Sequence, residues 1–516
     1  MVVFNKINEN AYYDSVTLMV ISSKISVVEG VNQAAVMMGT DHNKEIMKNS
    51  NILNEEGEKA TASDMIIGLE ATDESVIQEV LSVVDKELQS KTTDDEDVKT
   101  KFKTIDAAAK RISDLNLAVI SVPGKYAKNE AMKALNNNLN VLLFSDNVSV
   151  EEEVELKEKA IEKGLLMMGP DCGTAILNGV ALGFANKVSK GKIGIVGASG
   201  TGIQEVTTLI DKNDSGITQA LGTGGRDLKE AVGGKMMLME LEALKMDKDT
   251  EVILIVSKPP SEKIMKKIIQ AVKNIEKPVV TCFLGGDPSL VEESGALAME
   301  TLEDAAHAAV DLANGKEVEK INFTLSEDKV KSYVREEKGK LKESQKYIRG
   351  LFSGGTLCYE SILILKEKGV TTYSNVALEE KYQLENPDVS QKNTLLDMGE
   401  DYFTDGLPHP MLDTRLRVAR IKEEAKDKDV AVLLLDLVLG YGVHDDPAGD
   451  IAPAVREAKE TAAQDGRYLS VVASICGTDK DPQNFSEQEE KLKEVGIIVM
   501  PSNAQATRMA SLILER

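Results

Sequence analysis

One recurring pattern constrains this fold most: a short apolar segment that ends in a glycine-rich turn and leads directly into a helix. The clearest example, GKIGIVGASGTGIQEVTTLI, occupies residues 191–210. Apolar segments of strand length follow at residues 251–258 and 277–286, with helical patterns between them. Buried strands that alternate with helices are typical of parallel sheets covered by helices on both faces. We therefore expect an α/β protein with successive parallel-sheet domains of the flavodoxin or Rossmann type.

The same alternation appears on both sides of this region. Before it, strands are expected at residues 117–124 and 140–146, each followed by a helical pattern. After it, a glycine turn followed by a helix is expected within residues 349–369, and a long apolar strand at residues 428–440. The pattern thus predicts three consecutive α/β units.

The N-terminal region carries a different pattern. Residues 14–22 and 63–71 are rich in residues that favour strands, and residues 27–49 and 73–88 show helical spacing. These four elements predict a small α+β module. The charged segment 90–103 has no apolar period, and we interpret it as a linker.

These patterns divide the chain into five segments. Residues 316–348 alternate in charge and lack a broad apolar stripe, which indicates a helical connector. The expected segments are an α+β module (1–95), three α/β domains (104–190, 191–315 and 349–516) and the connector (316–348).

Charge and composition exclude several classes of function. The chain of 516 residues carries a formal net charge of -24, which disfavours binding to nucleic acid or anionic membranes. No apolar segment approaches the roughly 18 residues of a membrane-spanning helix, and no signal peptide is apparent. Its four cysteines are widely separated, so neither a disulfide framework nor a zinc ribbon is indicated. We expect a cytoplasmic protein.

The turn after the first strand of the central unit is the strongest candidate for anion binding. Small residues there allow a ligand to approach the backbone, and the first N–H groups of the helix are free to bind an anion. The alternative is a tight turn in which Ser199 or Thr201 only caps the helix. Neither the P-loop motif nor GxGxxG matches its spacing. The candidate residues are Ser199, Gly200, Thr201 and Gly202.

Two further glycine-rich turns are candidates for the same chemistry. Gly224, Gly225 and Arg226 follow a strand, and the guanidinium is suited to a phosphate or carboxylate, although a plain surface loop explains them equally well. The turn that opens the third unit repeats the arrangement of small residues before a helix, and we expect it to face the Ser199 turn across a cleft. Its residues are Ser353, Gly354, Gly355 and Thr356.

Two histidines are candidate acid–base residues. Prolines flank His409 on both sides, and His444 follows the apolar strand 428–440 at the end where ligands bind in α/β sheets. Asp445 and Asp446 either orient His444, bind Mg²⁺ together with a phosphate, or cap the following helix, which starts with proline. We assign His409, His444 and Asp445 as candidate catalytic residues.

Several motifs together resemble a known family. Residues 117–312, with VISVPG, GLLMMGPDCG and GKIGIVGASGTGIQE in order, resemble the α subunit of succinyl-CoA synthetase. Residues 350–516 resemble the C-terminal CoA-ligase domain of its β subunit. The fused order, with GLPHPMLD, GYGVHDDPA and CGTDKDPQ, is most similar to the FdrA family. That resemblance implies an acyl-CoA synthetase-like protein, or a subunit of an oxamate carbamoyltransferase in anaerobic allantoin catabolism.

Three departures from the ligase pattern limit what the resemblance implies. Ser294 stands where the ligases carry a phosphorylated histidine, and serine cannot form that N-phosphoryl intermediate. No segment is long enough for an ATP-grasp domain. The glycine-rich turn that holds CoA after the first strand also has no match.

Three functions remain open. The first is transfer from an activated acyl or carbamoyl phosphate to a small carboxylate or amide, as in oxamate carbamoylation. The second is an ADP-forming acyl-CoA ligase whose ATP-grasp domain lies on another chain, and the third is a non-catalytic CoA sensor or scaffold. The sequence establishes no cofactor, with Mg²⁺ and CoA as the two candidates, and predicts no protein-bound metal. We expect small anionic substrates, with partner subunits or further copies of this chain completing the assembly.

Overall fold

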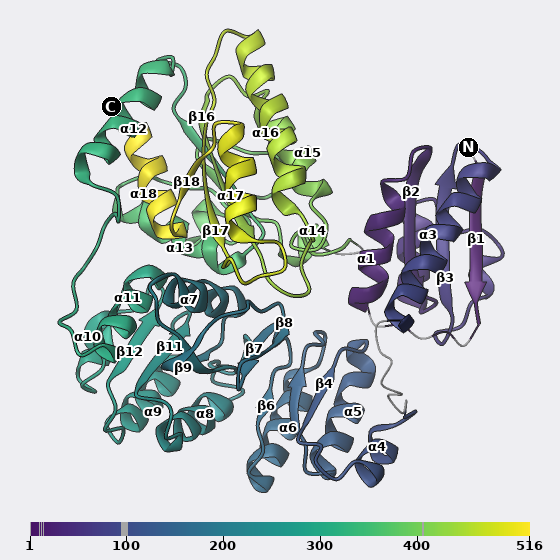
Figure 1. Cartoon of the computed structure of the whole chain (residues 1–516), viewed down its shortest axis with the longest axis horizontal. Coiled ribbons are helices and arrows are strands. Elements are labelled where there is room, and N and C mark those ends of the chain that lie inside the picture. The colour runs from purple at the N-terminus through teal and green to yellow at the C-terminus, as the bar shows by residue number, and fades with distance from the viewer. Residues whose placement is uncertain are drawn as a thin grey trace. The chain divides into compact units, whose positions relative to one another are not determined.

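The computed structural model describes residues 2–9, 11, 13, 15–93, 102–404 and 407–515 (Figure 1). The chain separates into two compact units. One contains Met1–Asp114 with Thr404–Pro408, and the other contains Leu115–Phe403 with His409–Arg516. Within the described ranges, no helix combines the length and the apolar character that spanning a bilayer requires.

The N-terminal module is a three-stranded antiparallel sheet of order β1-β3-β2. Its central strand alternates its side chains: Ile67 and Leu69 pack with Leu18 and Val80 on one face, and Ile66 packs on the other. Its elements are β1 (Val2–Asn8), α1 (Ser15–Ser26), β2 (Val31–Met38), α2 (Asp41–Asn49), η1 (Gly57–Lys59), β3 (Met65–Ala71), α3 (Glu74–Thr93) and α4 (Ile105–Arg111).

Two predictions for this module are wrong. Of residues 14–22, expected as a strand, the described residues 15–22 lie in helix α1, which buries Leu18, Ile21 and Ile25 on one face. Residues 27–49, expected as one helix, contain strand β2 and helix α2. The strand predicted at 63–71 and the helix at 73–88 are confirmed as β3 and α3. Helix α3 extends to Thr93, and much of the predicted linker lies outside the described residues.

The second unit begins with a small parallel sheet of order β4-β5-β6. Each of its first two strands leads into a helix, as the alternating pattern predicts. Its elements are β4 (Leu117–Ile120), α5 (Gly124–Asn136), β5 (Asn140–Leu143), α6 (Val150–Lys163) and β6 (Met167–Met168).

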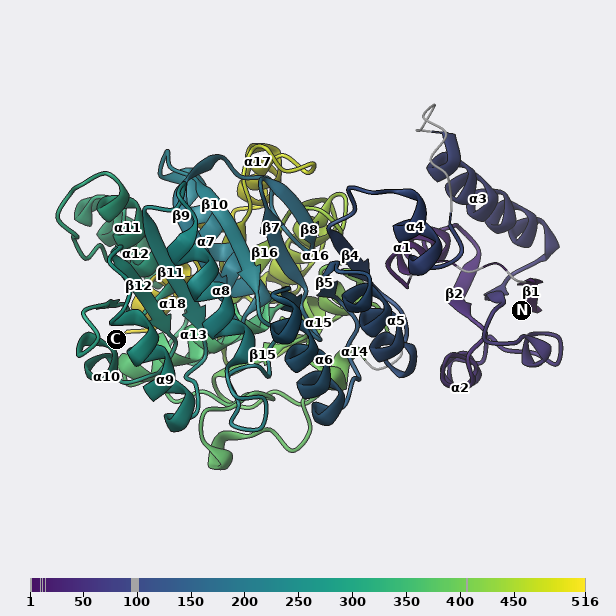
Figure 2. The same cartoon turned by 90° about the horizontal axis from the view of Figure 1, so that it is seen from below.

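The next sheet has seven strands in the order β13-β12-β11-β9-β10-β7-β8 (Figure 2). Strands β9 to β13 are parallel, and the hairpin β7–β8, which the sequence pattern does not predict, adds two strands at one edge. The elements are β7 (Thr174–Leu177), β8 (Val180–Gly183), β9 (Lys190–Gly197), α7 (Gly200–Lys212), β10 (Ile217–Gly222), α8 (Lys235–Met246), β11 (Val252–Ser257), α9 (Glu262–Val272), β12 (Val279–Phe283), α10 (Pro288–Glu292), β13 (Leu297–Ala298) and α11 (Leu302–Ala313).

The last sheet has five parallel strands in the order β15-β14-β16-β17-β18. The helix expected in the connector is α12 (Glu327–Lys340). The remaining elements are β14 (Tyr347–Phe352), α13 (Gly355–Glu367), η2 (Glu380–Tyr382), β15 (Thr394–Asp397), α14 (Asp401–Thr404), α15 (Arg415–Glu424), β16 (Val430–Val438), α16 (Pro447–Gln464), β17 (Ser470–Cys476), α17 (Phe485–Glu494), β18 (Ile498–Met500) and α18 (Asn503–Leu514). The predicted α/β class with parallel sheets and a small N-terminal α+β module is confirmed.

One apolar core joins the seven-stranded and five-stranded sheets. Ile203 on α7 and Ala309 on α11 belong to the same buried cluster as Leu357 on α13 and Ala510 on α18. Figure 1 shows α7, α11 and α13 where the two sheets approach each other. Because α7 and α13 each follow a strand at the carboxyl edge of its sheet, this packing brings two helix N-termini into contact.

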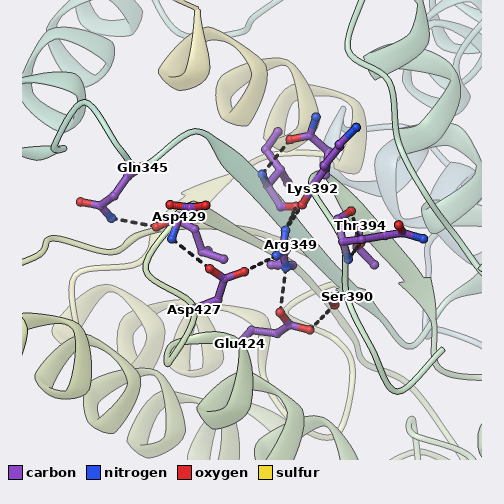
Figure 3. A network of polar contacts seen from close by, with 12 residues as sticks. Gln345, Arg349, Ser390, Lys392, Thr394, Glu424, Asp427 and Asp429 are labelled. Atoms are coloured by element: carbon purple, nitrogen blue, oxygen red, sulfur yellow. Dashed lines mark hydrogen bonds and ion pairs between the residues drawn. The ribbon is translucent and has the colours of Figure 1, made fainter. Parts of the chain in front are cut away.

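A buried arginine holds the opposite, amino edge of the five-stranded sheet (Figure 3). Arg349 donates to Glu424 at 2.8 Å, pairs with Asp427 and also donates to the carbonyl oxygen of Lys392. Its side chain is 1% exposed, so these bonds replace all of its hydration. A buried cation is tolerated only when its partners satisfy it.

We expect Arg349→Met to lower the free energy of unfolding by about 3 kcal/mol, because it leaves carboxylates without their buried partner. The matched control is Lys266→Met, which removes a cation from an exposed ion pair with Glu262 and is expected to leave the free energy of unfolding nearly unchanged. Denaturant unfolding followed by circular dichroism measures both. Equal effects in the two variants would show that the Arg349 network contributes no more than a surface pair.

Candidate functional site

The turn before α7 has the geometry of a capped helix N-terminus with free donors. Strand β9 ends at Gly197, and the Ser199 hydroxyl accepts the N–H of Gly202 at 3.1 Å. A Cβ atom on Gly202 would lie 2.6 Å from that hydroxyl, so only glycine allows this close approach. The N–H groups of Gly200 and Thr201 have no acceptor among the described residues.

The turn before α13 is built differently, because the chain supplies its own anion. The N–H groups of Ser353 and Gly354 both donate to the Asp436 carboxylate, each at 2.8 Å. Asp436 is fully buried and also pairs with Arg417 at 2.9 Å. In this turn, the N–H groups of Gly355 and Thr356 are the ones left without an acceptor in the described part of the chain.

The two turns meet directly. The hydroxyl groups of Ser199 and Thr356 lie 2.5 Å apart and share a hydrogen bond. A Cβ atom on Gly354 would lie 2.6 Å from the methyl carbon of Thr201. The positive ends of two helix dipoles thus converge with free N–H groups from both helices, an arrangement that favours a bound anion.

His409 lies beside the α13 turn. A Cβ atom on Gly399 would lie 2.5 Å from His409 Nε2 and 3.1 Å from the carbonyl oxygen of Ser353, so the imidazole and that turn both adjoin Gly399. The ring of Phe184 lies 5.9 Å from the imidazole, centroid to centroid. Because Phe184 also accepts a hydrogen bond from Thr174, the β7–β8 hairpin forms the wall next to the histidine.

The protonation state of His409 follows from its contacts. Its Nδ1 accepts the N–H of Met411 at 3.2 Å, which leaves the proton of the neutral ring on Nε2. Desolvation of the charged form, and then the Arg417 guanidinium, lower the pKa of His409 to about 4. At pH 7 this imidazole is therefore a neutral hydrogen-bond donor through Nε2.

His444 adjoins the His409 loop, but its own nitrogen atoms are engaged. Its backbone N–H donates to the carbonyl oxygen of Met411, its Nδ1 accepts the N–H of Asp446, and its Nε2 lies 3.3 Å from Asp450. Asp446 caps α16 and pairs with Lys491 at 2.7 Å. Asp445 is exposed, and no contact ties it to His444 among the described residues. The structure thus agrees with the capping interpretation of Asp446.

The Gly224 turn packs within the protein. Arg226 pairs with Glu153 at 2.9 Å and donates to the carbonyl oxygen of Val148. Gly224 has a φ of +83°, and a Cβ atom there would lie 2.3 Å from the carbonyl oxygen of Pro170. The structure therefore connects Gly224, Gly225 and Arg226 with α6 and the turn at Pro170, whereas Ser199 and Thr356 meet each other.

Three residues at the site carry no strong sequence signal. Asp436 caps the α13 turn, Asp397 ends β15, and Lys258 follows β11. A sequence pattern shows that the two aspartates lie at or near the carboxyl ends of strands, where ligands bind in α/β sheets. The sequence pattern does not show that Asp436 has hydrogen-bond partners for both carboxylate oxygens while Asp397 has a partner for only one.

The described residues are not arranged to hold a metal ion. The carboxyl edge of the three-stranded sheet, where a CoA diphosphate would be expected, does not fit that group either. No group of three His, Cys, Asp or Glu side chains in the described ranges is arranged to hold a metal ion, and residues 1–107 contain no cysteine. At the carboxyl edge of the three-stranded sheet, a Cβ atom on Gly124 would lie 2.4 Å from the carbonyl oxygen of Asn147, so backbone already fills that turn. The exposed carboxylates of Asp146 and Asp171 follow β5 and β6 there and disfavour a diphosphate.

Three family models match parts of the chain. A model described as "CoA-ligase" matches residues 351–513, and one described as "CoA binding domain" matches residues 188–285. A model described as "AllF, heavy metal-associated domain" matches residues 1–107. The chain thus combines domains of the CoA-ligase and CoA-binding superfamily with an AllF-type N-terminal domain.

One similar protein matches this chain over nearly its whole length, and others match about a third of it. The Escherichia coli K12 protein YahF is 43% identical over 508 residues, which cover 98% of this chain and 97% of that protein. The α subunit of ADP-forming succinate–CoA ligase from Staphylococcus epidermidis is 26% identical over 191 residues, which cover 36% of this chain and 61% of the subunit. Subunit SauD of the ADP-forming sulfoacetate-CoA ligase from Bilophila wadsworthia is 26% identical over 33% of this chain and 59% of that subunit.

Matches among solved structures include PH0766 from Pyrococcus horikoshii and an ATP citrate lyase from Methanothrix soehngenii. The first has a TM-score of 0.34 at 17% identity and covers 80% of this chain and 86% of that one. The second has a TM-score of 0.37 at 18% identity and covers 45% of each chain.

Proposed function

This chain belongs to the family of the Escherichia coli protein YahF, and we propose that it takes part in group transfer from an activated acyl or carbamoyl phosphate. The acceptor is a small carboxylate or amide. Oxamate is the acceptor that the resemblance to the FdrA family and the AllF-type N-terminal domain favour. In this proposal, the chain is a carbamoyltransferase subunit that works with partner subunits.

The convergence of α7 and α13 is the observation that carries the proposal. The four N–H groups of Gly200, Thr201, Gly355 and Thr356 have no acceptor among the described residues, and Ser199 and Thr356 add hydroxyl groups. A phosphoryl group has enough oxygen atoms to accept from both helix ends. Donors fixed in this way stabilise the charge that grows on phosphate as it leaves.

The transfer step can be written with this chain's own residues. The nitrogen of the acceptor amide bonds to the carbamoyl carbon and gives up one proton, and the bond from that carbon to the phosphate oxygen breaks. The electron pair of the broken bond leaves with phosphate, which takes up the proton. The helix N-termini stabilise the departing phosphate, and neutral His409 donates from Nε2 to the carbonyl oxygen as it gains charge. Neither ATP nor a phosphohistidine takes part.

The test is a transfer assay on the chain together with any partner subunits it requires. Labelled carbamoyl phosphate and oxamate should yield an N-carbamoyl product and free phosphate with no nucleotide present. Added ATP or CoA should not raise the rate. A strict requirement for either cosubstrate would contradict the proposal.

An ADP-forming acyl-CoA ligase is the second candidate, because the CoA-ligase model matches residues 351–513. This function needs a phosphoryl acceptor on the loop that carries Ser294. That hydroxyl donates to the carbonyl oxygen of Val291 at 2.5 Å and accepts the N–H of Ala296 at 3.3 Å, so it is held within its own turn. A non-catalytic role would give neither carbamoyl transfer nor ligation.

We expect no phosphorylation of this chain when it is incubated with labelled ATP and Mg²⁺. Ser294 cannot form an N-phosphoryl intermediate, and none of the three family models that match the chain describes an ATP-grasp domain. Acid-labile label measured after gel filtration checks the prediction, with a succinyl-CoA synthetase α–β complex as the positive control. Stoichiometric acid-labile label would favour the ligase over the transferase.

A further inference from the structure

Asp397 lies at the N-terminal end of α13, and hydrogen bonds of its backbone hold it there. It is the last residue of β15, its N–H donates to the Asn375 side chain at 3.0 Å, and its carbonyl oxygen accepts from the amide of that side chain at 2.8 Å. These two hydrogen bonds fix the backbone position from which the Asp397 side chain extends. The side chain is therefore placed by the sheet and does not depend on a flexible loop.

The carboxylate points at the first residue of α13. A Cβ atom on Gly355 would lie 2.3 Å from Asp397 Oδ2, so the oxygen occupies the space that a side chain at this position would need. The other oxygen, Oδ1, accepts the N–H of Gly399 at 3.0 Å. Among the described residues, Oδ2 accepts no hydrogen bond and forms no ion pair.

Asp397 and Asp436 lie near the same turn in opposite states. Asp436 accepts two backbone N–H groups and pairs with Arg417, so its bonding is complete. Asp397 keeps one oxygen without a partner and its side chain is only partly buried, so a small molecule at the helix ends can reach it. Two carboxylates in such different environments are suited to different roles.

The charged and titratable groups that face Asp397 come from four elements. Desolvation is the main cause that raises the pKa of Asp397 to about 6, Asp436 and Glu400 act in the same direction, and the Gly399 N–H and Lys258 oppose it. Cys358 on α13 is a further titratable neighbour, and its burial raises its pKa so that it stays protonated. His409, which contacts Gly399, is neutral at pH 7. Asp397 is therefore ionised at pH 7 yet basic enough to take a proton.

We propose that Asp397 is the proton acceptor of this site, taking a proton from the acceptor's amide nitrogen as that nitrogen attacks the carbamoyl carbon. The inference rests on the proposed function. The N–H bond breaks towards Oδ2, the C–N bond forms, and the C–O bond to phosphate breaks with its electron pair on phosphate. The proton then passes from Asp397 to the departing phosphate, which restores the carboxylate.

His409 does not fill this role. Its Nδ1 already accepts the N–H of Met411 and its Nε2 carries the proton of the neutral ring, so it can donate but has no free lone pair for a proton. His444 likewise has both nitrogen atoms engaged. Among the titratable groups named at the helix ends, Asp397 Oδ2 is the one with an open acceptor.

The first test measures turnover of the complete complex against pH. Asp397→Asn keeps the shape of the side chain and an oxygen for the Gly399 N–H, and it should lower kcat by about 10²–10⁴-fold at pH 8. The wild-type rate should rise through about pH 6, and this acid limb should be absent from the residual activity of the variant. Glu385→Gln, which makes the same change on an exposed carboxylate outside the site, should keep both the rate and the acid limb.

The second test uses inorganic phosphate as the probe and needs no turnover. An ionised Asp397 beside the anion opposes phosphate binding, so Asp397→Asn should bind phosphate about 3–10-fold more tightly than wild type at pH 8 and equally well at pH 5. Because phosphate titrates in the same range, the ratio between the two proteins is the quantity to compare, measured by calorimetry.

The outcomes separate the two claims. Wild-type transfer with an unchanged rate in Asp397→Asn would overturn the role of Asp397 and leave the proposed function standing. An equal phosphate affinity of the two proteins at pH 8 would overturn it as well. No transfer by the wild-type complex at any pH would overturn the proposed function, and this inference with it.

Discussion

Gly200→Val should abolish phosphate binding while the protein stays folded. Gly200 is the first residue of α7, and a Cβ atom there meets only Thr174, whose hydroxyl oxygen would lie 3.2 Å away. The valine side chain would therefore fit the fold, but its methyl groups would crowd an anion that approaches the N–H groups of Gly200 and Thr201. Loss of two charge-assisted hydrogen bonds of about 1.5–3 kcal/mol each lowers affinity at least about 10²-fold.

Calorimetric titration with phosphate, together with a thermal melt, measures this effect. Gly339→Val is the matched control, because Gly339 lies near the end of α12 with no atom within 4 Å of the position of its Cβ. This control should bind phosphate as wild type does. Parental phosphate affinity in a folded Gly200→Val protein would remove the α7 turn from the site.

The second large effect distinguishes the two candidate histidines. Glutamine keeps hydrogen-bonding capacity but does not titrate. His409→Gln should lower turnover by about 10²–10⁴-fold with little change in melting temperature, because the Nε2 donor moves away from the helix ends. His444→Gln should weaken the contact with Asp450 and lower stability, with activity per folded molecule preserved. The reverse pattern would exchange the roles of the two residues.

The same His409→Gln variant tests the protonation state by its stability. The folded-state pKa of His409 is about 4, below the unfolded value of 6.5, so between these pH values the unfolded chain binds a proton that the folded chain does not. The free energy of unfolding therefore falls as pH falls through this window, by about 3 kcal/mol in total. Denaturant unfolding at several pH values should show this loss in wild type and not in His409→Gln. Parallel pH profiles of the two proteins would exclude a neutral, desolvated His409.

The sequence predicts the α/β sheets well because their strands are buried on both faces. Strands such as VILIVS at β11 are continuous apolar runs between turns, a signal that no tertiary contact has to supply. The first part of the N-terminal module lacks this signal, and the prediction of its elements is wrong. Residues 14–22 carry the β-branched residues of a strand, but burial of Leu18, Ile21 and Ile25 against β3 makes the segment helical. The tertiary context overrides local propensity there.

The sequence predicts the two turns of the candidate site but not the contacts that join them. The turns at Ser199 and Thr356 are local features, and their small residues mark them. Their hydrogen bond joins residues 157 positions apart in the chain and arises from the shared core beneath α7 and α13. The capping of Ser353 and Gly354 by Asp436 is likewise long-range, as is the position of Asp397 beside Gly355. Contacts of this kind follow from packing and leave no local pattern.

A crystal structure of the protein with phosphate tests the central claim most directly. The account predicts one phosphate between the two helices, with its oxygen atoms within hydrogen-bond distance of N–H groups from both the Gly200 turn and the Gly355 turn. The distance between the Ser199 and Thr356 hydroxyl groups should increase or be bridged by the anion, because both groups can then donate to it. Phosphate bound at another place, or no phosphate between α7 and α13 at saturating concentration, would contradict the account.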